Sequence, residues 1–360
     1  MIGARNVETL GNLTMVHFES TSPVAAVERL GVIMEPRAGD PTEAWGVLNP
    51  ATARGRDGEL YVFARVVAEG NYSRIRMARV IFDGGRPVGL ERLGFALEPS
   101  EPYELRGDGE GGCEDPRITF LPALDMYVMA YTAYGPEGAR VALAVSPDLF
   151  TWERLGVVDF GEADGVDFDG LANKDAFFFP EPVLAPDGAL CFALMHRPMT
   201  GADHHWTAPT SLAELPPSIW VSYVPVAEAL KNPLNLLRLR QHRLVMSPLH
   251  PWEHIKLGGG APPLLLGNSW LLFHHGIDNL AAPGEPRMLR YSAGAFLLDR
   301  CDLSRVLWRS AEPVMTPDTA LEQSGIVNNV VFPTGIDLAA DGTVDVYYGM
   351  ADARIGVARV

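Results

Sequence analysis

Apolar residues along this chain occur in short runs, and turns rich in glycine, proline and aspartate separate them. Short apolar runs with such boundaries are typical of β-strands. Five stretches share one form: an apolar strand, a polar turn, and an aromatic-rich strand that ends in polar residues. They predict β-hairpins near 49–65, 114–132, 174–197, 260–276 and 328–349.

A second repeat alternates with the hairpins. The motif ERLG begins at 28, 91 and 153, and weaker copies begin at 242 and 309. The last four copies each follow a hairpin and predict an outer strand. The copy at 28 precedes every hairpin, so we expect residues 28–36 to pair with the C-terminal strands near 346–360 and complete the last unit.

Five four-stranded units closed by an N-terminal strand predict an all-β fold, a five-bladed β-propeller formed by residues 1–360 as a single domain. The alternative is a β-sandwich with a separate helical domain. Helical periodicity is scarce, and the segment VAEALKNPLNLL from 226 predicts only a short insertion.

The composition limits the classes of partner. The formal net charge of −16 argues against nucleic acid and anionic membranes. Three scattered cysteines and the lack of a run of about 18 apolar residues predict a reduced, cytoplasmic protein that does not span a membrane. CxxC and HExxH motifs are missing, so we expect no metal and no cofactor. Homo-oligomer formation stays open.

Polar residues cluster at the ends of the predicted hairpin strands, where a propeller carries its binding face. Acids with aromatic neighbours suggest a carbohydrate subsite; they are Asp115 and Asp352, with Tyr131 and Tyr348. Cations from several units suggest an anion such as phosphate or a carboxylate; they are Arg65, Lys174, Arg197, Lys256 and His275. The alternative is that each cation pairs locally with an acid. The run KLGGGAPP lacks the order of a P-loop, and its glycines predict a close backbone approach.

Taken in order, the blocks GCEDPRIT, NKD, LMHRP, KLGGGAPPLL, WLLFHHG, AFLLD, NNVVFPTG and VYYGMAD resemble glycoside hydrolase family 130. The resemblance covers about residues 45–356. The family contains inverting β-mannoside phosphorylases and some β-mannosidases on a five-bladed propeller.

The resemblance implies roles for individual residues. It makes Asp115 the general acid, which protonates the glycosidic oxygen directly or through the 3-hydroxyl of the mannosyl unit. It assigns phosphate to Arg197, Lys256 and His275, with Lys174 nearby. Asn49, Arg65 and Asp352 match positions that hold the sugar in the family. Glu114, Arg117, Tyr131 and Tyr348 are also expected to bind sugar, because they lie at the ends of the predicted hairpin strands. For Glu114, the alternative to sugar binding is a structural role.

The function implied is phosphorolysis of a manno-oligosaccharide or mannosyl-glucose by inorganic phosphate, with α-mannose 1-phosphate as the product. One alternative is an inverting β-mannosidase with Asp352 or Glu322 as base. Another is a propeller that binds carbohydrate without catalysis. The linkage (β-1,2 or β-1,4) and the acceptor stay open, and segments 98–110 and 199–217 are expected to shape the acceptor side.

Overall fold

The computed structural model describes residues 7–10, 13–16, 24, 27–163, 166–200, 215–339 and 341–360. These residues form an all-β protein of several antiparallel sheets with a few short helices. The first four-stranded group consists of β4 (Gly46–Arg54), β5 (Leu60–Ala68), β6 (Tyr72–Asp83) and β7 (Arg86–Leu97). The second consists of β8 (Gly111–Leu121), β9 (Met126–Gly135), β10 (Gly138–Ser146) and β11 (Glu153–Val157).

The remaining sheets follow in chain order. The third contains β14 (Asn173–Phe178), β15 (Val183–Leu184), β16 (Leu190–Pro198), β17 (Ile219–Pro225) and β18 (Arg240–Met246). The fourth contains β19 (Lys256–Gly259), β20 (Leu264–Leu266), β21 (Ser269–Asn279), β22 (Leu289–Asp299) and β23 (Val306–Arg309). The fifth contains β24 (Val331–Leu338), β25 (Val344–Met350), β26 (Arg354–Arg359) and β3 (Glu28–Met34).

Smaller elements complete the description. Two separate strand pairs are β1 (Val7–Leu10) with β2 (Leu13–Val16), and β12 (Glu162–Ala163) with β13 (Val166–Asp167). The helices are α1 (Val226–Lys231), α2 (Ala320–Gln323) and the 3-10 turns η1 (Pro41–Glu43), η3 (Pro233–Leu237) and η4 (Pro251–Glu253). The short insertion expected from 226 is therefore confirmed as α1 and η3, which Pro233 separates.

The N-terminal strand β3 completes the last sheet. It pairs with β26 through Met34–Ile355 and Val357–Gly31, as expected for residues 28–36. One feature differs from the expected separate units, because β6 and β8 pair in parallel and merge the first two groups into one eight-stranded sheet. The contact is short and joins Tyr72 and Ser73 to two glycines, whose lack of side chains permits the close approach.

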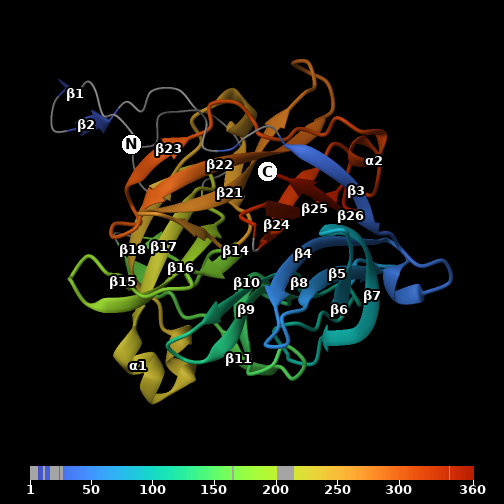
Figure 1. The fold of residues 1–360 in the computed structure, drawn as a ribbon, viewed down its shortest axis with the longest axis horizontal. Helices are drawn as coiled ribbons and strands as arrows, with labels where there is room; N and C mark the ends of the chain where they lie inside the picture. The colour runs from blue at the N-terminus through green and yellow to red at the C-terminus, as the bar shows by residue number, and fades with distance from the viewer. Residues whose placement is uncertain are drawn as a thin grey trace.

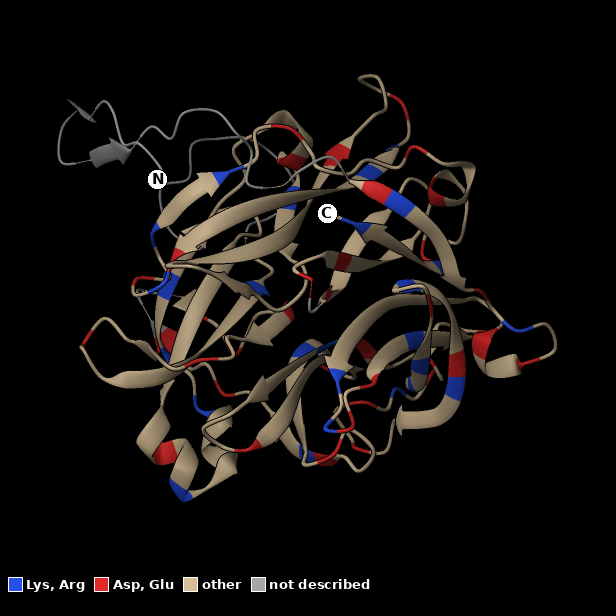
Figure 2. Cartoon of the chain, viewed as in Figure 1, with Lys and Arg blue, Asp and Glu red and all other residues tan. Residues whose placement is uncertain are grey.

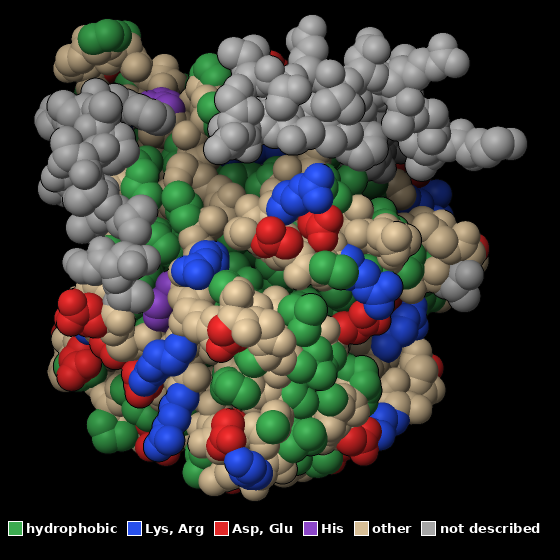
Figure 3. Space-filling model, turned by 90° about the vertical axis from the view of Figure 1, so that its left-hand side faces the viewer, with side chains coloured by type: hydrophobic (Ala, Val, Ile, Leu, Met, Phe, Trp, Pro, Cys, Tyr) green, Lys and Arg blue, Asp and Glu red, His purple; other side chains and the backbone are tan. Residues whose placement is uncertain are grey.

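The first strand of each sheet lies toward the middle of the molecule, and the outer strands β7, β11, β18, β23 and β3 lie at its periphery (Figure 1). The inner strands also contact one another: β4 contacts β8 and β24, and β14 contacts β8 and β19. Acidic and basic residues are interspersed along the ribbon (Figure 2). The flank in Figure 3 likewise carries apolar side chains among both signs of charge.

A buried glutamate tied to an arginine recurs in four of the strand groups, and we call it the Glu–Arg clasp. The glutamate lies before the innermost strand, accepts backbone N–H groups and pairs with an arginine of the outermost strand. The pairs are Glu43–Arg92, Glu104–Arg154, Glu253–Arg309 and Glu322–Arg29. In the third sheet, His196, Ser222 and His242 form a hydrogen-bonded chain across the strands. The clasp explains the arginine of the ERLG repeat, which ties the outer edge of a sheet to its inner edge.

Candidate active site

Three inner strands each carry a β-bulge that begins at a polar residue with left-handed backbone. Asn49 (φ 45°) lies on β4, Asp115 (φ 46°) on β8 and Asp175 (φ 57°) on β14. The strand pairing shifts register after Leu48, Glu114 and Lys174, respectively. A bulge turns a side chain away from the regular alternation of the strand and is frequent next to active sites. The sequence motifs LNP, EDP and KDA therefore place equivalent polar groups on neighbouring strands.

Asp115 is buried and held by two donors. Asn49 Nδ2 donates to its Oδ1 at 2.8 Å, and Arg65 Nη1 donates to the same oxygen at 3.2 Å. Burial alone would raise the pKa of Asp115, but the positive charges of Arg65, Lys174 and Arg117 outweigh burial and lower it. In this structure Asp115 is an ion-paired carboxylate.

Glu114 contacts the same cations as Asp115, because the two carboxylates accept from the two Nη atoms of Arg65. Its carboxylate accepts a hydrogen bond from Arg65 Nη2 at 2.8 Å and one from Lys174 Nζ at 3.1 Å. Burial would lower the pKa of Lys174, yet Glu114 and Asp115 hold it above the ordinary value. Lys174 is thus tied to the acid side of the site through Glu114.

Asp175 forms the centre of a second group of charges, and the sequence analysis assigned it no role. Arg197 Nε donates to Asp175 Oδ2 at 2.6 Å, and His275 Nε2 lies 3.7 Å from the same oxygen. Burial lowers the pKa of His275 to about 3, so its ring is neutral at physiological pH. Gly258 faces these three side chains so closely that a Cβ would lie 2.6 Å from His275 Cε1 and 2.7 Å from Arg197 Nε. The expected close approach at the Gly-rich run is therefore confirmed.

Lys256 adds positive charge to the second group. It lies two residues before Gly258 on β19 and so faces the same side of the strand. Among the described residues its ammonium has no hydrogen bond or ion pair. Burial and the charge of Arg197 lower the pKa of Lys256 to about 8. The local-pairing alternative thus holds for Arg65, Lys174 and Arg197 but not for Lys256.

Two further groups belong to the same electrostatic neighbourhood. Asp352 follows β25 with φ 51°, and burial raises its pKa to about 6 despite the nearby Arg65. Tyr291 is the third residue of β22 and stacks on His275 with ring centroids 6.3 Å apart. Burial raises the pKa of Tyr291 to about 12, and the negative charge of Asp352 contributes to the same shift. The sequence offered one signal for Tyr291, an aromatic residue at the polar end of a strand.

The structure does not bring every selected residue into this cluster. The Tyr131 hydroxyl donates to Glu104 at 2.6 Å, and the Tyr348 hydroxyl donates to Glu322 at 2.9 Å. Both rings are buried in the hydrophobic core between sheets. Glu322, named as a base in the hydrolase alternative, belongs to a clasp with Arg29. We therefore leave these three residues out of the proposed site.

Strand alternation is the physical reason for this difference. On the second strands, Arg65, Arg197 and His275 face the cluster, and the residue before each of them faces the opposite side. Tyr131 and Tyr348 occupy the second kind of position, as do His196 and His274, which are hydrogen-bonded to Ser222 and Glu253. Applied to the aligned hairpins, this period of two would have separated the two sets from the sequence.

Arg117 also differs from its expected role as a sugar ligand. Its guanidinium is 1 % exposed and donates to the carbonyl oxygens of Asp115, Pro116 and Gly260. It lies behind the cluster as part of the framework that supports it.

The two segments expected on the acceptor side are only partly described. In segment 98–110, Arg106 lies over the Tyr134 ring at 4.9 Å, and Lys174 Nζ lies 5.7 Å from the same ring. This segment therefore borders the acid side of the cluster. Of segment 199–217, residues 201–214 lie outside the described part of the chain.

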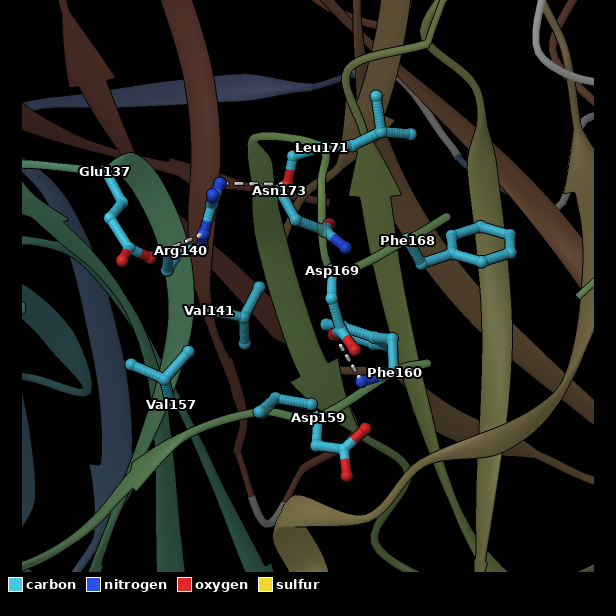
Figure 4. A pocket seen from close by; sticks show the side chains of 11 residues that line it. Glu137, Arg140, Val141, Val157, Asp159, Phe160, Phe168, Asp169, Leu171 and Asn173 are labelled. Carbon is cyan, nitrogen blue, oxygen red and sulfur yellow. Dashed lines mark hydrogen bonds and ion pairs between the residues drawn. The ribbon is translucent and has the colours of Figure 1, made fainter. Parts of the chain in front are cut away.

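A separate pocket of about 280 Å³ lies between β10 and β11 on one side and the chain before β14 on the other (Figure 4). Its polar groups are already engaged: Asp169 accepts the N–H groups of Phe160 and Gly161, and Arg140 donates to the carbonyl of Leu171. Its lining residue Asn173 bonds His196, on the face opposite to Lys174. This pocket is distinct from the cluster around Asp115, and we assign it no ligand.

The described residues show no group of histidine, cysteine or carboxylate side chains that could hold a metal ion. In the same part of the chain, no helix is long and apolar enough to cross a membrane. The charged groups of the cluster are three ion-paired carboxylates (Asp115, Glu114 and Asp175), one acid with a raised pKa (Asp352), and several cations.

Comparison with known proteins agrees with this chemistry. Residues 21–360 match glycoside hydrolase family 130, described as beta-1,4-mannooligosaccharide phosphorylase. A 1,2-beta-oligomannan phosphorylase of Thermoanaerobacter is 33% identical over 75% of this chain and 78% of its own length. A beta-1,2-mannobiose phosphorylase of the same organism is 33% identical over 69% of this chain and 66% of its own length. The solved structure of a beta-1,2-mannobiose phosphorylase from Listeria innocua superposes with a TM-score of 0.68 at 22% identity, covering 93% of this chain and 97% of its own.

Proposed function

We propose, on the premise that this chain belongs to glycoside hydrolase family 130, that it is an inverting β-mannoside phosphorylase that forms α-mannose 1-phosphate. The family resemblance of the sequence blocks is confirmed by the match over residues 21–360. The class of activity agrees with the relatives, which are named as mannoside phosphorylases.

The proposed architecture is a single five-bladed propeller made by the whole chain. Support comes from the groups β4–β7, β8–β11, β14–β18, β19–β23 and β24–β26 with β3. The inner strands contact one another in the order β24, β4, β8, β14 and β19. In such a ring the bulges of β4, β8 and β14 converge on one end of the central channel.

The observation that carries the proposal is the surplus of positive charge beside the acid. Arg197 pairs with the carboxylate of Asp175, the nearby Lys256 has no carboxylate partner among the described residues, and His275 beside them is neutral. Buried like charges repel each other, and both burial and the repulsion from Arg197 lower the pKa of Lys256. A bound phosphate dianion would relieve it, with the arginine as a forked donor and the lysine as a point charge.

In the proposed reaction, phosphate held by Arg197, Lys256 and His275 attacks the anomeric carbon from the face opposite the leaving sugar. Asp115 supplies the proton to the glycosidic oxygen, directly or through the sugar 3-hydroxyl. Asn49 and Arg65 orient the Asp115 carboxyl. Since phosphate is itself the nucleophile, phosphorolysis needs no second catalytic carboxylate, whereas an inverting hydrolase does.

Proton donation requires that Asp115 carry a proton, although nearby cations lower its pKa in this structure. The phosphate dianion would neutralise part of that positive charge and so raise the pKa of Asp115 in the complex. The nucleophile and the acid are therefore linked: binding of phosphate favours the protonated form of the carboxyl that the reaction needs.

We further propose β-1,2-linked mannosides as the preferred donors. The three relatives that match 75%, 69% and 79% of this chain are all named for β-1,2-linked substrates. A relative named beta-1,4-mannooligosaccharide phosphorylase, from Ruminococcus albus, matches only 33% of this chain. No cofactor is proposed, and three free cysteines agree with a reduced cytoplasmic location.

The test is an assay of β-1,2- and β-1,4-mannobiose with and without inorganic phosphate. We expect α-mannose 1-phosphate by ³¹P NMR, only when phosphate is present, and faster from the β-1,2 substrate. Free mannose formed without phosphate would support a hydrolase instead, with Asp352 as the candidate base because its pKa is raised to about 6. Binding of mannosides without turnover in either condition would support a carbohydrate-binding propeller.

A further inference from the structure

Arg117 is a buried cation that the proposed chemistry does not use. Its guanidinium is not ion-paired with any carboxylate of the described residues. Nε donates to Gly260 O at 2.6 Å, and Nη1 donates to Asp115 O at 3.1 Å and to Pro116 O at 3.0 Å. Burial lowers the pKa of Arg117, although Asp175 and Asp115 oppose that shift. Burying a charge costs free energy unless its hydrogen bonds compensate. The three backbone carbonyls that Arg117 contacts should therefore show what it stabilises.

The first reason is the bulge that carries the acid. The pairing of β8 with β9 runs from Glu114 directly to Arg117, so Asp115 and Pro116 lie outside the ladder. Their carbonyl oxygens would otherwise be buried without donors, and the left-handed backbone of Asp115 (φ 46°) is unfavourable for a residue with a side chain. Arg117 Nη1 satisfies both oxygens and so holds the bulge in the conformation that aims the Asp115 carboxyl.

The second reason is the connection to the other side of the cluster. Gly260 directly follows β19, the strand that carries Lys256 and Gly258. The guanidinium also lies 5.7 Å from the centroid of the Phe332 ring, and that ring lies 4.3 Å from the ring of His275. Arg117 thus contacts the backbone of the acid strand, the backbone of the Gly-rich run and the ring that supports His275.

We propose that Arg117 is a positioning residue that sets the distance between the proton donor Asp115 and the phosphate-binding side chains on and beside β19. The inference rests on the proposed function, since it assumes that acid and phosphate act in one step. It places Arg117 among the positioning residues, because Nε and Nη1 donate to the protein backbone, while the buried Nη2 has no hydrogen-bond partner among the described residues. A displacement of about 1 Å in such a geometry can cost on the order of 10²-fold in rate.

The experiment compares two donors in the presence of phosphate. β-1,2-Mannobiose has a poor leaving group that needs a proton, whereas 2,4-dinitrophenyl β-mannoside has a leaving group that does not. In Arg117→Lys and Arg117→Gln we expect kcat for mannobiose to fall about 10²-fold. We expect kcat for the activated donor to fall only about threefold, with the KM for mannobiose nearly unchanged.

Arg92→Lys serves as the matched control, because Arg92 is a half-buried arginine of the clasp with Glu43, remote from the bulge. It should lower the melting temperature and leave the ratio of the two rates as in the wild type. If the Arg117 variants do not fold, Phe332→Leu replaces them in the test. This variant keeps the guanidinium but removes the ring beside it, and its kcat for mannobiose should fall selectively, by a smaller factor.

Three results would overturn the inference: equal loss on both donors, a raised KM for mannobiose with unchanged kcat, or unchanged kinetics in Arg117→Lys. The first would indicate a purely structural arginine, and the second a sugar ligand. Failure of the proposed function is a separate outcome, since it would appear in the wild type as turnover that does not depend on phosphate.

Discussion

Asp115 and Glu114 are adjacent in sequence, but their surroundings give them different chemistry. The Asp115 carboxyl lies on the bulge, next to Asn49 and Arg65, and in the proposed reaction it faces the glycosidic oxygen. Glu114 holds Arg65 and Lys174 in place and is 2 % exposed. One acid is therefore assigned to the reaction and the other to the orientation of cations.

We expect Asp115→Asn to remove nearly all turnover of mannobiose, at least about 10²-fold in kcat. Glu114→Gln should have a smaller effect on kcat, because it keeps an acceptor for Arg65 while it removes the charge. Steady-state kinetics of both variants, with mannoside affinity from calorimetry, check this order. A larger loss in kcat for Glu114→Gln would show that the roles are reversed.

Lys256 predicts a pH dependence for phosphate binding. Its pKa is lowered to about 8, so its ammonium is charged below that pH and loses its proton as pH rises through it. The KM for phosphate should therefore rise above about pH 8. In Lys256→Arg the rise attributable to this group should disappear, since a guanidinium stays charged.

Lys256→Ala should lower kcat/KM for phosphate by about 10–10²-fold at pH 7, which corresponds to about 1.5–3 kcal/mol for a charge-assisted hydrogen bond. Mannoside affinity should change little, because the contact is made to the nucleophile. Unchanged phosphate kinetics in this variant would contradict the assignment of Lys256 to the anion site.

At the scale of the elements, β16 and β21 each serve two purposes on their two faces. One face supplies Arg197 and His275 to the cluster, and the other face supplies His196 to the histidine chain and His274 to the clasp of Glu253. A clasp glutamate is buried and fully paired, so removing its charge leaves an arginine without compensation. The conformation of the site thus depends on polar groups that never reach it.

Glu253→Gln tests a clasp directly. Breaking a buried ion pair by altering one partner costs about 3–5 kcal/mol. Glu91→Gln is the matched control, because Glu91 pairs with Arg79 at the surface with both side chains about half exposed. Chemical denaturation should show a large decrease in the free energy of unfolding for Glu253→Gln and almost none for Glu91→Gln.

The same clasp predicts how stability changes in acid. Burial would raise the pKa of Glu253, but hydrogen bonds from His274 and Arg309 outweigh it and lower the value to about 2. The ordinary value is about 4.3, so the contribution of Glu253 is complete above that pH and is lost as pH falls toward 2. Stability measured from pH 6 to pH 3 should therefore fall less steeply in Glu253→Gln than in the wild type.

At the scale of the whole molecule, the fold depends on a contact between the two ends of the described chain. β3 pairs with β26, and Arg29 of β3 reaches Glu322 across the same sheet. Without β3 the edge of β26 would be unpaired and the carboxylate of Glu322 would lose its arginine.

Deletion of residues 1–36 should therefore remove a large share of the free energy of unfolding, which is about 5–15 kcal/mol for proteins in general. Deletion of residues 1–23 is the matched control, since it leaves β3 in place and should melt close to the full chain. Equal melting temperatures for the 1–36 deletion and the full chain would show that β3 is dispensable.

The sequence by itself determined the hairpins, the outer ERLG strands, the pairing of residues 28–36 with the C-terminal strands, and the family. These features follow from local patterns: the alternation of apolar residues, turn residues and repeated motifs. Only the tertiary structure decided which polar residues share a site. Arg117 turned toward backbone carbonyls, Tyr131 and Tyr348 toward buried glutamates, and Asp175 entered the phosphate side. A local pattern states that a side chain is polar, but its partner can lie on a segment distant in the sequence, and a bulge can reverse the face to which the side chain points.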